Sequence, residues 1–183
     1  MPKRLGERIL FESRIFCVKE VDLELSSGKR VSYEFLDWGN SVMAVPLVSR
    51  DTLLLVKEYH AAVGEYQLGL CKGALDKGKD PKEVMNKELQ EEIGYRAKRL
   101  DELAILTSSP GYSTQKTHIF LARDLVKSKL EGDEAEELEV VPCPFSKFEE
   151  LIDKGELSEA RMITALYLAK RFLKNNQESL SNI

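Results

Sequence analysis

The chain has 183 residues, and its 43% hydrophobic and 32% charged content is typical of a globular domain that buries a core. Its net charge of −4, with both signs interspersed, gives no electrostatic reason to expect nucleic-acid or membrane-surface binding. The sequence has neither an N-terminal apolar segment nor an apolar run near about 18 residues, so neither secretion nor a membrane span is expected. Cys17, Cys71 and Cys143 are odd in number and widely spaced, which favours reduced thiols in a cytoplasmic protein.

The first part of the chain reads as strands. Apolar residues alternate with polar ones over 15–25 and again over 31–35, with a Ser-Ser-Gly turn between them, which predicts a β-hairpin. The β-branched and aliphatic segments 42–48 and 53–59 predict a second strand pair. A short extended piece is expected over 66–70.

The next segment has the features of a well-marked helix. Asp80 is a favourable N-cap, Pro81 suits the first helical position, and Glu83 completes a capping-box pattern. A four-residue repeat predicts the buried stripe of this helix: Met85, Leu89 and Ile93. Gly94 suits the position just after the helix.

The remainder of the chain alternates strands and helices. Strands are expected at 102–107, 117–122 and 138–141. A helix is expected to begin near Ser146, with Glu149 as its capping-box partner, and to stop at Gly155. A last helix is expected over 158–174, before a polar tail. Its predicted core side is formed by Met162, Ile163, Leu166, Ala169, Phe172 and Leu173. This order predicts an α+β fold, divided into an N-terminal β extension (1–40), a main domain (41–175) and a tail (176–183).

The most informative feature is a cluster of three carboxylates on the helix of 81–93. Glu88, Glu91 and Glu92 are three or four residues apart, so they are neighbours on the helix surface. Three like charges repel unless a cation offsets them, and grouped carboxylate oxygens suit Mg²⁺ or Mn²⁺. Two such ions about 3.5–4 Å apart can clamp both oxygens of a phosphate displacement. The cluster therefore predicts metal-dependent phosphate chemistry.

Residues 73–95 resemble the Nudix box, Gly-x5-Glu-x7-Arg-Glu-U-x-Glu-Glu-x-Gly-U, where U is a bulky apolar residue. The matching positions are Gly73, Glu88, Leu89, Glu91, Glu92, Gly94 and Tyr95. The resemblance implies a Nudix α/β/α sandwich with a mixed sheet, an N-terminal β extension and a homodimer. It also implies that the backbone carbonyl of Lys72 joins Glu88, Glu91 and Glu92 as a metal ligand.

Segments outside the box resemble the ADP-ribose pyrophosphatase and ADP-compounds hydrolase branch of that family. The resemblance rests on Tyr66-Gln-Leu-Gly-Leu-Cys-Lys-Gly73, on Leu130-Glu-Gly-Asp-Glu134, and on the position of Pro110 after the box. It implies cleavage of ADP-ribose, diadenosine polyphosphates or NADH. Pro110, Gly111 and Tyr112 are the candidate substrate-binding residues, although the sequence Ser109-Pro110-Gly111-Tyr112 is also typical of a tight surface turn.

Three further residues have candidate roles. A family general base commonly comes from a later loop, so Glu134 and Glu137 are candidates, and the alternative is that this acidic run is a solvated loop. Arg161 is a candidate for contacting substrate phosphate or ribose. It is equally consistent with a surface residue at a helix start.

Lys79 and Lys87 replace the glutamate and arginine of the box, and Lys57 and Gln67 stand where relatives often have arginine and glutamate. Lys87 can instead lie between Glu83 and Glu91, each four residues away. No proposed side-chain ligand is lost, so hydrolysis is the preferred interpretation. The alternatives are a catalytically weak module that binds or senses ADP-ribose-like nucleotides, and a metal-stabilised structural protein without a nucleotide ligand.

Overall fold

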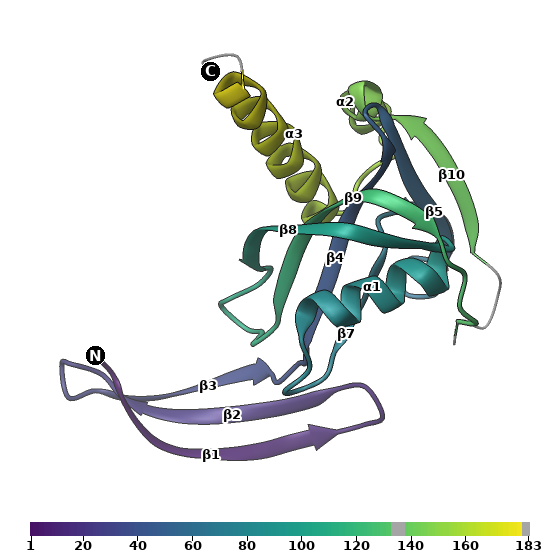
Figure 1. The fold of residues 1–183 in the computed structure, drawn as a ribbon. Coiled ribbons are helices and arrows are strands. Elements are labelled where there is room, and N and C mark those ends of the chain that lie inside the picture. The colour runs from purple at the N-terminus through teal and green to yellow at the C-terminus, as the bar shows by residue number, and fades with distance from the viewer. Residues whose placement is uncertain (133–137, 181–183) are drawn as a thin grey trace.

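The computed structural model describes residues 1–132 and 138–180. Its first part is a three-stranded antiparallel sheet in the order β1 (Lys3–Glu12), β2 (Cys17–Glu24) and β3 (Arg30–Leu36). This sheet extends to one side of the main body (Figure 1). The β2–β3 pairing confirms the predicted hairpin. Strand β1 was not predicted, because its apolar and charged residues do not alternate and all ten are exposed.

The main sheet has seven strands. Its path is β10 (Glu139–Pro144), β5 (Thr52–His60), β4 (Asn40–Ser49), β9 (Lys116–Lys127) and β8 (Tyr95–Thr107). Strand β6 (Glu65–Gly69) pairs with β5, and β7 (Lys72–Leu75) pairs with β4. Strands β4 and β9 run parallel while the other pairs are antiparallel, so the sheet is mixed, as predicted.

Helices cover both faces of this sheet (Figure 1). Helix α1 (Pro81–Glu92) packs on the face that includes Val42 and Ala44 of β4. Helix α3 (Ala160–Leu180), with the 3₁₀ turn η1 (Phe145–Lys147) and helix α2 (Phe148–Asp153), packs on the face that includes Met43 and Val45. Because β4 is covered on both sides, residues 42–47 are all buried and read as a continuous apolar run. The predicted sandwich is confirmed.

The ends of α1 follow the sequence prediction. The Asp80 carboxylate accepts hydrogen bonds from the backbone N–H groups of Lys82 and Glu83, at 2.7 and 3.4 Å. Met85, Leu89 and Ile93 are buried, so the predicted stripe is confirmed. Gly94 follows with a φ of +75°, a conformation that favours glycine and stops the helix there.

Two predictions about the C-terminal region were wrong. Ser146 does not cap a helix: its backbone N–H and hydroxyl donate to the Asp51 carboxylate at 2.7 and 2.9 Å, and α2 begins only at Phe148. Helix α3 continues past Lys174 to Leu180, since no glycine or proline interrupts this polar segment. The predicted division of the chain at residue 40 stays a prediction. No helix within the part of the chain described here has the length and apolarity needed to cross a membrane.

Candidate active site

Gly73 and Glu88 are in very close contact. A Cβ atom added to Gly73 would lie 2.1 Å from Cδ of Glu88 and 2.2 Å from its Oε1. Strand β7 carries Gly73 past α1, and the missing side chain leaves the space that the Glu88 carboxylate occupies. The glycine of the box is therefore required by packing: it lets a carboxylate lie directly against the strand backbone.

Glu92 is a buried carboxylate, only 5% exposed. The backbone N–H of Lys72 lies 3.3 Å from its Oε2 and 3.5 Å from its Oε1, and the buried Cys71 thiol also bonds to it. Burial raises the pKa of Glu92 from its ordinary value of 4.5 to about 8, and the negative charge of Glu88 adds to the rise. The positive charge of Lys72 opposes the rise without cancelling it.

The side chain of Lys72 is held by a residue that the sequence analysis did not single out. Its Nζ lies 2.5 Å from Oε2 of Glu58 on β5. The alternation of β5 gave a usable signal, because Glu58 shares the face of Leu54 and Val56, which pack toward α1. Glu58, Lys72 and Glu92 thus form a connected group beside Gly73 and Glu88.

Glu91 differs from the other two acids of the helix. Lys87 lies one turn before it, with Nζ at 2.7 and 2.8 Å from the two carboxylate oxygens, as the helix spacing predicted. Lys129 donates to the backbone carbonyl of Glu91 at 2.8 Å. The Glu91 carboxylate is therefore paired with a cation, while the charge of Glu88 disfavours the ionised form of the neighbouring Glu92.

The donor set fits a divalent cation. Across residues 1–132 and 138–180, no group of three or more His, Cys, Asp or Glu side chains is arranged to hold a metal ion. However, Glu92 is a buried carboxylate with a raised pKa, next to a second carboxylate, and a cation there would offset both charges. Carboxylate oxygens are the ligands that Mg²⁺ and Mn²⁺ prefer.

The other predicted residues either have hydrogen-bond partners elsewhere in the fold or lie outside the described residues. Pro110, Gly111 and Tyr112 form a turn between β8 and β9, and its hydrogen bonds join it to the end of β3. Arg161 lies on the face covered by α3, where its guanidinium donates to Glu159 at 2.7 Å and to Thr117 at 3.5 Å. Glu134 and Glu137 lie outside the described residues.

Lys57 and Gln67 line a cavity of about 520 Å³ at the edge of the main sheet. Its wall also includes residues from β6, from β10 and from the segment between α2 and α3: Tyr66, Leu68, Glu139, Val141, Glu156 and Ser158. Lys57 pairs with Glu139, the first residue of β10, at 3.4 Å. Two of the four positions that depart from the family pattern therefore share one depression.

Comparison with known proteins agrees with this geometry. Residues 37–166 match the NUDIX domain family. The chain is 39% identical to the ADP compounds hydrolase NudE of Escherichia coli (strain K12), over 94% of each chain, and 29% identical to the ADP-ribose pyrophosphatase of Bacillus subtilis (strain 168), over 90% of this chain and 92% of that one. A crystal structure of an ADP compounds hydrolase superposes with a TM-score of 0.88, at 38% identity, covering 96% of this chain and 95% of the other.

The fold and the site define an α/β/α sandwich enzyme whose acidic helix follows a glycine-bearing strand. The chain belongs to the NUDIX domain family and is a Nudix hydrolase, which confirms the family predicted from residues 73–95.

Proposed function

We propose that this enzyme hydrolyses the pyrophosphate bond of ADP-linked compounds, giving AMP and a phosphorylated product. ADP-ribose is the first candidate substrate, and diadenosine polyphosphates and NADH are the others. The named activities of the similar proteins support this proposal. The structural observation that carries it is the pair formed by Glu88, packed against Gly73, and the buried Glu92.

Nudix hydrolases generally need a divalent metal ion. We propose Mg²⁺ or Mn²⁺, held by Glu88, Glu92 and the backbone carbonyl of Lys72, with Glu91 as a further ligand or as an acceptor that orients the others. The ion supplies Lewis-acid polarisation of a phosphate oxygen when it is bound.

The chain's own side chains orient this ligand set. The Lys72 amide donates to Glu92 and fixes its carboxylate, while Glu58 holds the Lys72 side chain. Lys87 holds Glu91. Each contact reduces the freedom of a carboxylate before substrate arrives, which lowers the reorganisation needed during the reaction.

For substrate binding and proton transfer we retain the residues predicted from the sequence. Pro110, Gly111 and Tyr112 are proposed to contact the nucleotide, and the Tyr112 side chain, which is 60% exposed, offers a ring on which a base can stack. Arg161 is proposed as a phosphate contact, which requires it to exchange its bond to Glu159 for one to substrate. Glu134 or Glu137 is proposed as the general base.

We also propose that the protein is a cytoplasmic homodimer. The three cysteines are free thiols, which suits a reducing compartment. The N-terminal sheet exposes large apolar side chains that a second copy could cover: Leu5, Ile9, Leu10, Phe11, Phe16 and Tyr33.

Product analysis of ADP-ribose incubated with the protein and Mg²⁺ tests the proposal, with Glu92→Gln as the control variant. AMP and ribose 5-phosphate from the wild type alone support hydrolysis at this site. No turnover, with ADP-ribose still raising the melting temperature, would instead favour a nucleotide-binding module. This second candidate is favoured by one observation: Lys87, which pairs with Glu91, stands where the family has an arginine.

A further inference from the structure

The turn between β8 and β9 is attached to the N-terminal sheet. The backbone N–H of Leu36, the last residue of β3, donates to the Tyr112 carbonyl at 2.8 Å, and the Thr114 N–H donates to the Leu36 carbonyl at 3.0 Å. Leu36 and Ser113 form a parallel β-bridge. The segment 109–114 therefore continues the hydrogen bonding of the N-terminal sheet, although it is more than seventy residues away in the chain.

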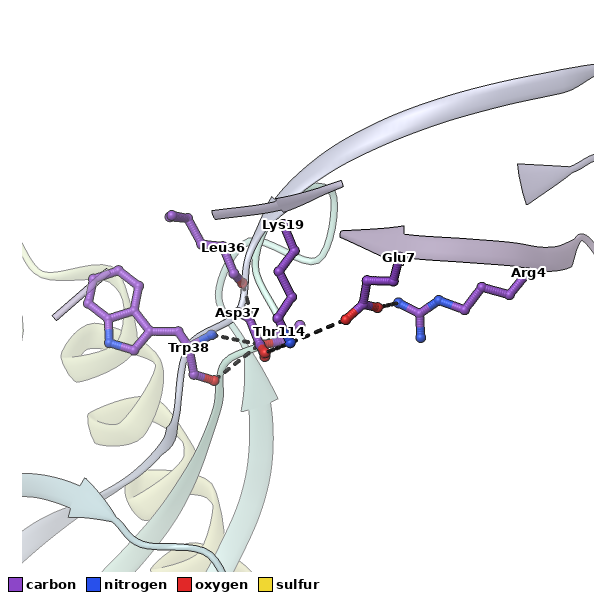
Figure 2. Close-up of polar contacts among 7 residues, drawn as sticks. All are labelled: Arg4, Glu7, Lys19, Leu36, Asp37, Trp38 and Thr114. Atoms are coloured by element: carbon purple, nitrogen blue, oxygen red, sulfur yellow. Dashed lines mark hydrogen bonds and ion pairs between the residues drawn. The ribbon is translucent and has the colours of Figure 1, made fainter. Parts of the chain in front are cut away.

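The hydroxyl of Thr114 completes this junction, which consists of residues 36–38 and 109–114. It accepts a hydrogen bond from the Trp38 backbone N–H at 2.9 Å. It lies 3.1 Å from the Trp38 carbonyl, 3.4 Å from the Leu36 carbonyl and 3.3 Å from Oδ1 of Asp37, and its single hydrogen can be donated to one of these at a time. Figure 2 shows the hydroxyl close to residues 36–38, the short linker between β3 and β4.

An ion-pair chain extends the junction across the N-terminal sheet. Lys19 of β2 pairs with Asp37 and lies 3.2 Å from Glu7 of β1, and Glu7 in turn pairs with Arg4 at 2.6 Å (Figure 2). The hydrogen bond from Lys19 lowers the pKa of Asp37, so the aspartate is charged at neutral pH. Residues of β1, β2, the linker and the turn are therefore connected in one network.

The turn and the sheet also line an open depression of about 270 Å³. Pro110, Gly111 and Tyr112 form one wall, and residues of the sheet, among them Arg4 and Tyr33, form the other. The backbone bonds of Leu36 and the bonds of the Thr114 hydroxyl join the turn to the end of β3, so both help to fix where the turn lies relative to the sheet.

We propose that Thr114 and Asp37 are positioning residues that hold the turn 109–113 against the N-terminal sheet and so set its contact with the nucleotide. This inference rests on the proposed function, because it takes the turn to be a substrate contact. Neither residue contacts the reacting phosphate in the proposal. Their effect is on substrate binding, while Glu88 and Glu92 remain responsible for the chemical step.

Thr114→Val tests the proposal, because it keeps the side-chain shape and removes the hydroxyl. Thr114→Ser restores the hydroxyl, and Thr164→Val removes a comparable exposed hydroxyl, bonded at 2.8 Å to the Ala160 carbonyl on α3. Asp37→Asn is a second, independent variant. Hydrogen exchange over residues 35–39 and 108–116 measures the junction without substrate, and KM and kcat for ADP-ribose measure its effect on the reaction.

Thr114→Val is expected to speed exchange at both segments and to raise KM about three- to tenfold, the effect of losing one or two hydrogen bonds, with kcat within about twofold of wild type. Thr114→Ser and Thr164→Val should behave as wild type, and Asp37→Asn should change exchange and KM in the same direction as Thr114→Val. Unchanged exchange in Thr114→Val would overturn the role of the hydroxyl. Faster exchange with unchanged KM, or a fall in kcat alone, would overturn the positioning of substrate.

The failure of the proposed function would be visible separately. If the wild type turns over no ADP-ribose, the proposed reaction fails before any variant is compared. Exchange then still tests the junction, and the shift in melting temperature with ADP-ribose tests positioning: Thr114→Val must reduce that shift, and an equal shift in both proteins overturns the inference.

Discussion

Replacing Glu92 by glutamine should make the metal-free enzyme more stable while it abolishes the response to metal. Glutamine has nearly the shape of glutamate and can still accept the Lys72 N–H bond, but it carries no charge. The ordinary carboxylate pKa of 4.5 rises to about 8 in the fold because Glu92 is buried and faces Glu88. Ionising Glu92 is therefore unfavourable to folding, and the substitution removes that cost.

The size of the effect depends on pH. Because the folded-state pKa is raised, the wild type has its full stability below pH 4.5 and loses it as the pH rises toward 8. At pH 7 the lost stability amounts to about 3 kcal/mol, and above pH 9 it approaches about 5 kcal/mol, at about 1.4 kcal/mol for each pKa unit. Glu92→Gln should not lose this stability.

The assay is urea unfolding of both proteins at pH 5, 7 and 9 in the presence of a chelator, repeated with Mg²⁺. The free energies of unfolding should be closest at pH 5 and diverge as the pH rises, and Mg²⁺ should stabilise only the wild type. Glu91→Gln is the matched control. Its carboxylate pairs with Lys87, so its loss should be neutral or destabilising by less than about 1 kcal/mol. A Glu92→Gln protein that is less stable than wild type at pH 9 would refute the burial argument.

Three further predictions follow from single contacts. Gly73→Ala places a Cβ 2.1 Å from Cδ of Glu88, so the carboxylate must move; kcat should fall roughly 10²-fold in a protein whose circular dichroism is unchanged, and wild-type turnover would show that the close contact is dispensable. Glu58→Gln weakens the bond that holds Lys72 and should lower kcat/KM about three- to tenfold in steady-state kinetics, whereas an unaltered value would remove Glu58 from the site. Asp80→Ala removes the N-cap of α1 and should cost about 1 kcal/mol in urea unfolding, with Asp80→Asn close to wild type; equal losses in both would argue against capping.

The local signals in the sequence were sufficient for the box helix. Its cap at Asp80, its buried stripe and its end at Gly94 depend on residues within one or two turns, so short-range chemistry determines them. The same holds for the Lys87–Glu91 pair, because helix spacing places the two side chains within reach of each other. The family was predicted from the resemblance of residues 73–95 to the Nudix box, which includes both glycines as well as the acids.

Tertiary structure decided the features that join distant segments. Strand β1 has no buried face, so its sequence shows no alternation of apolar and polar residues. It is held in place by antiparallel pairing with β2. The raised pKa of Glu92 results from its burial next to Lys72 and Cys71. Spacing along the helix cannot predict this burial, because Lys72 and Cys71 come from another segment of the chain. Thr114 is an ordinary loop residue in the sequence. It becomes part of the junction because the fold brings the end of β3 to the turn between β8 and β9, where the backbone groups of both segments need hydrogen-bond partners.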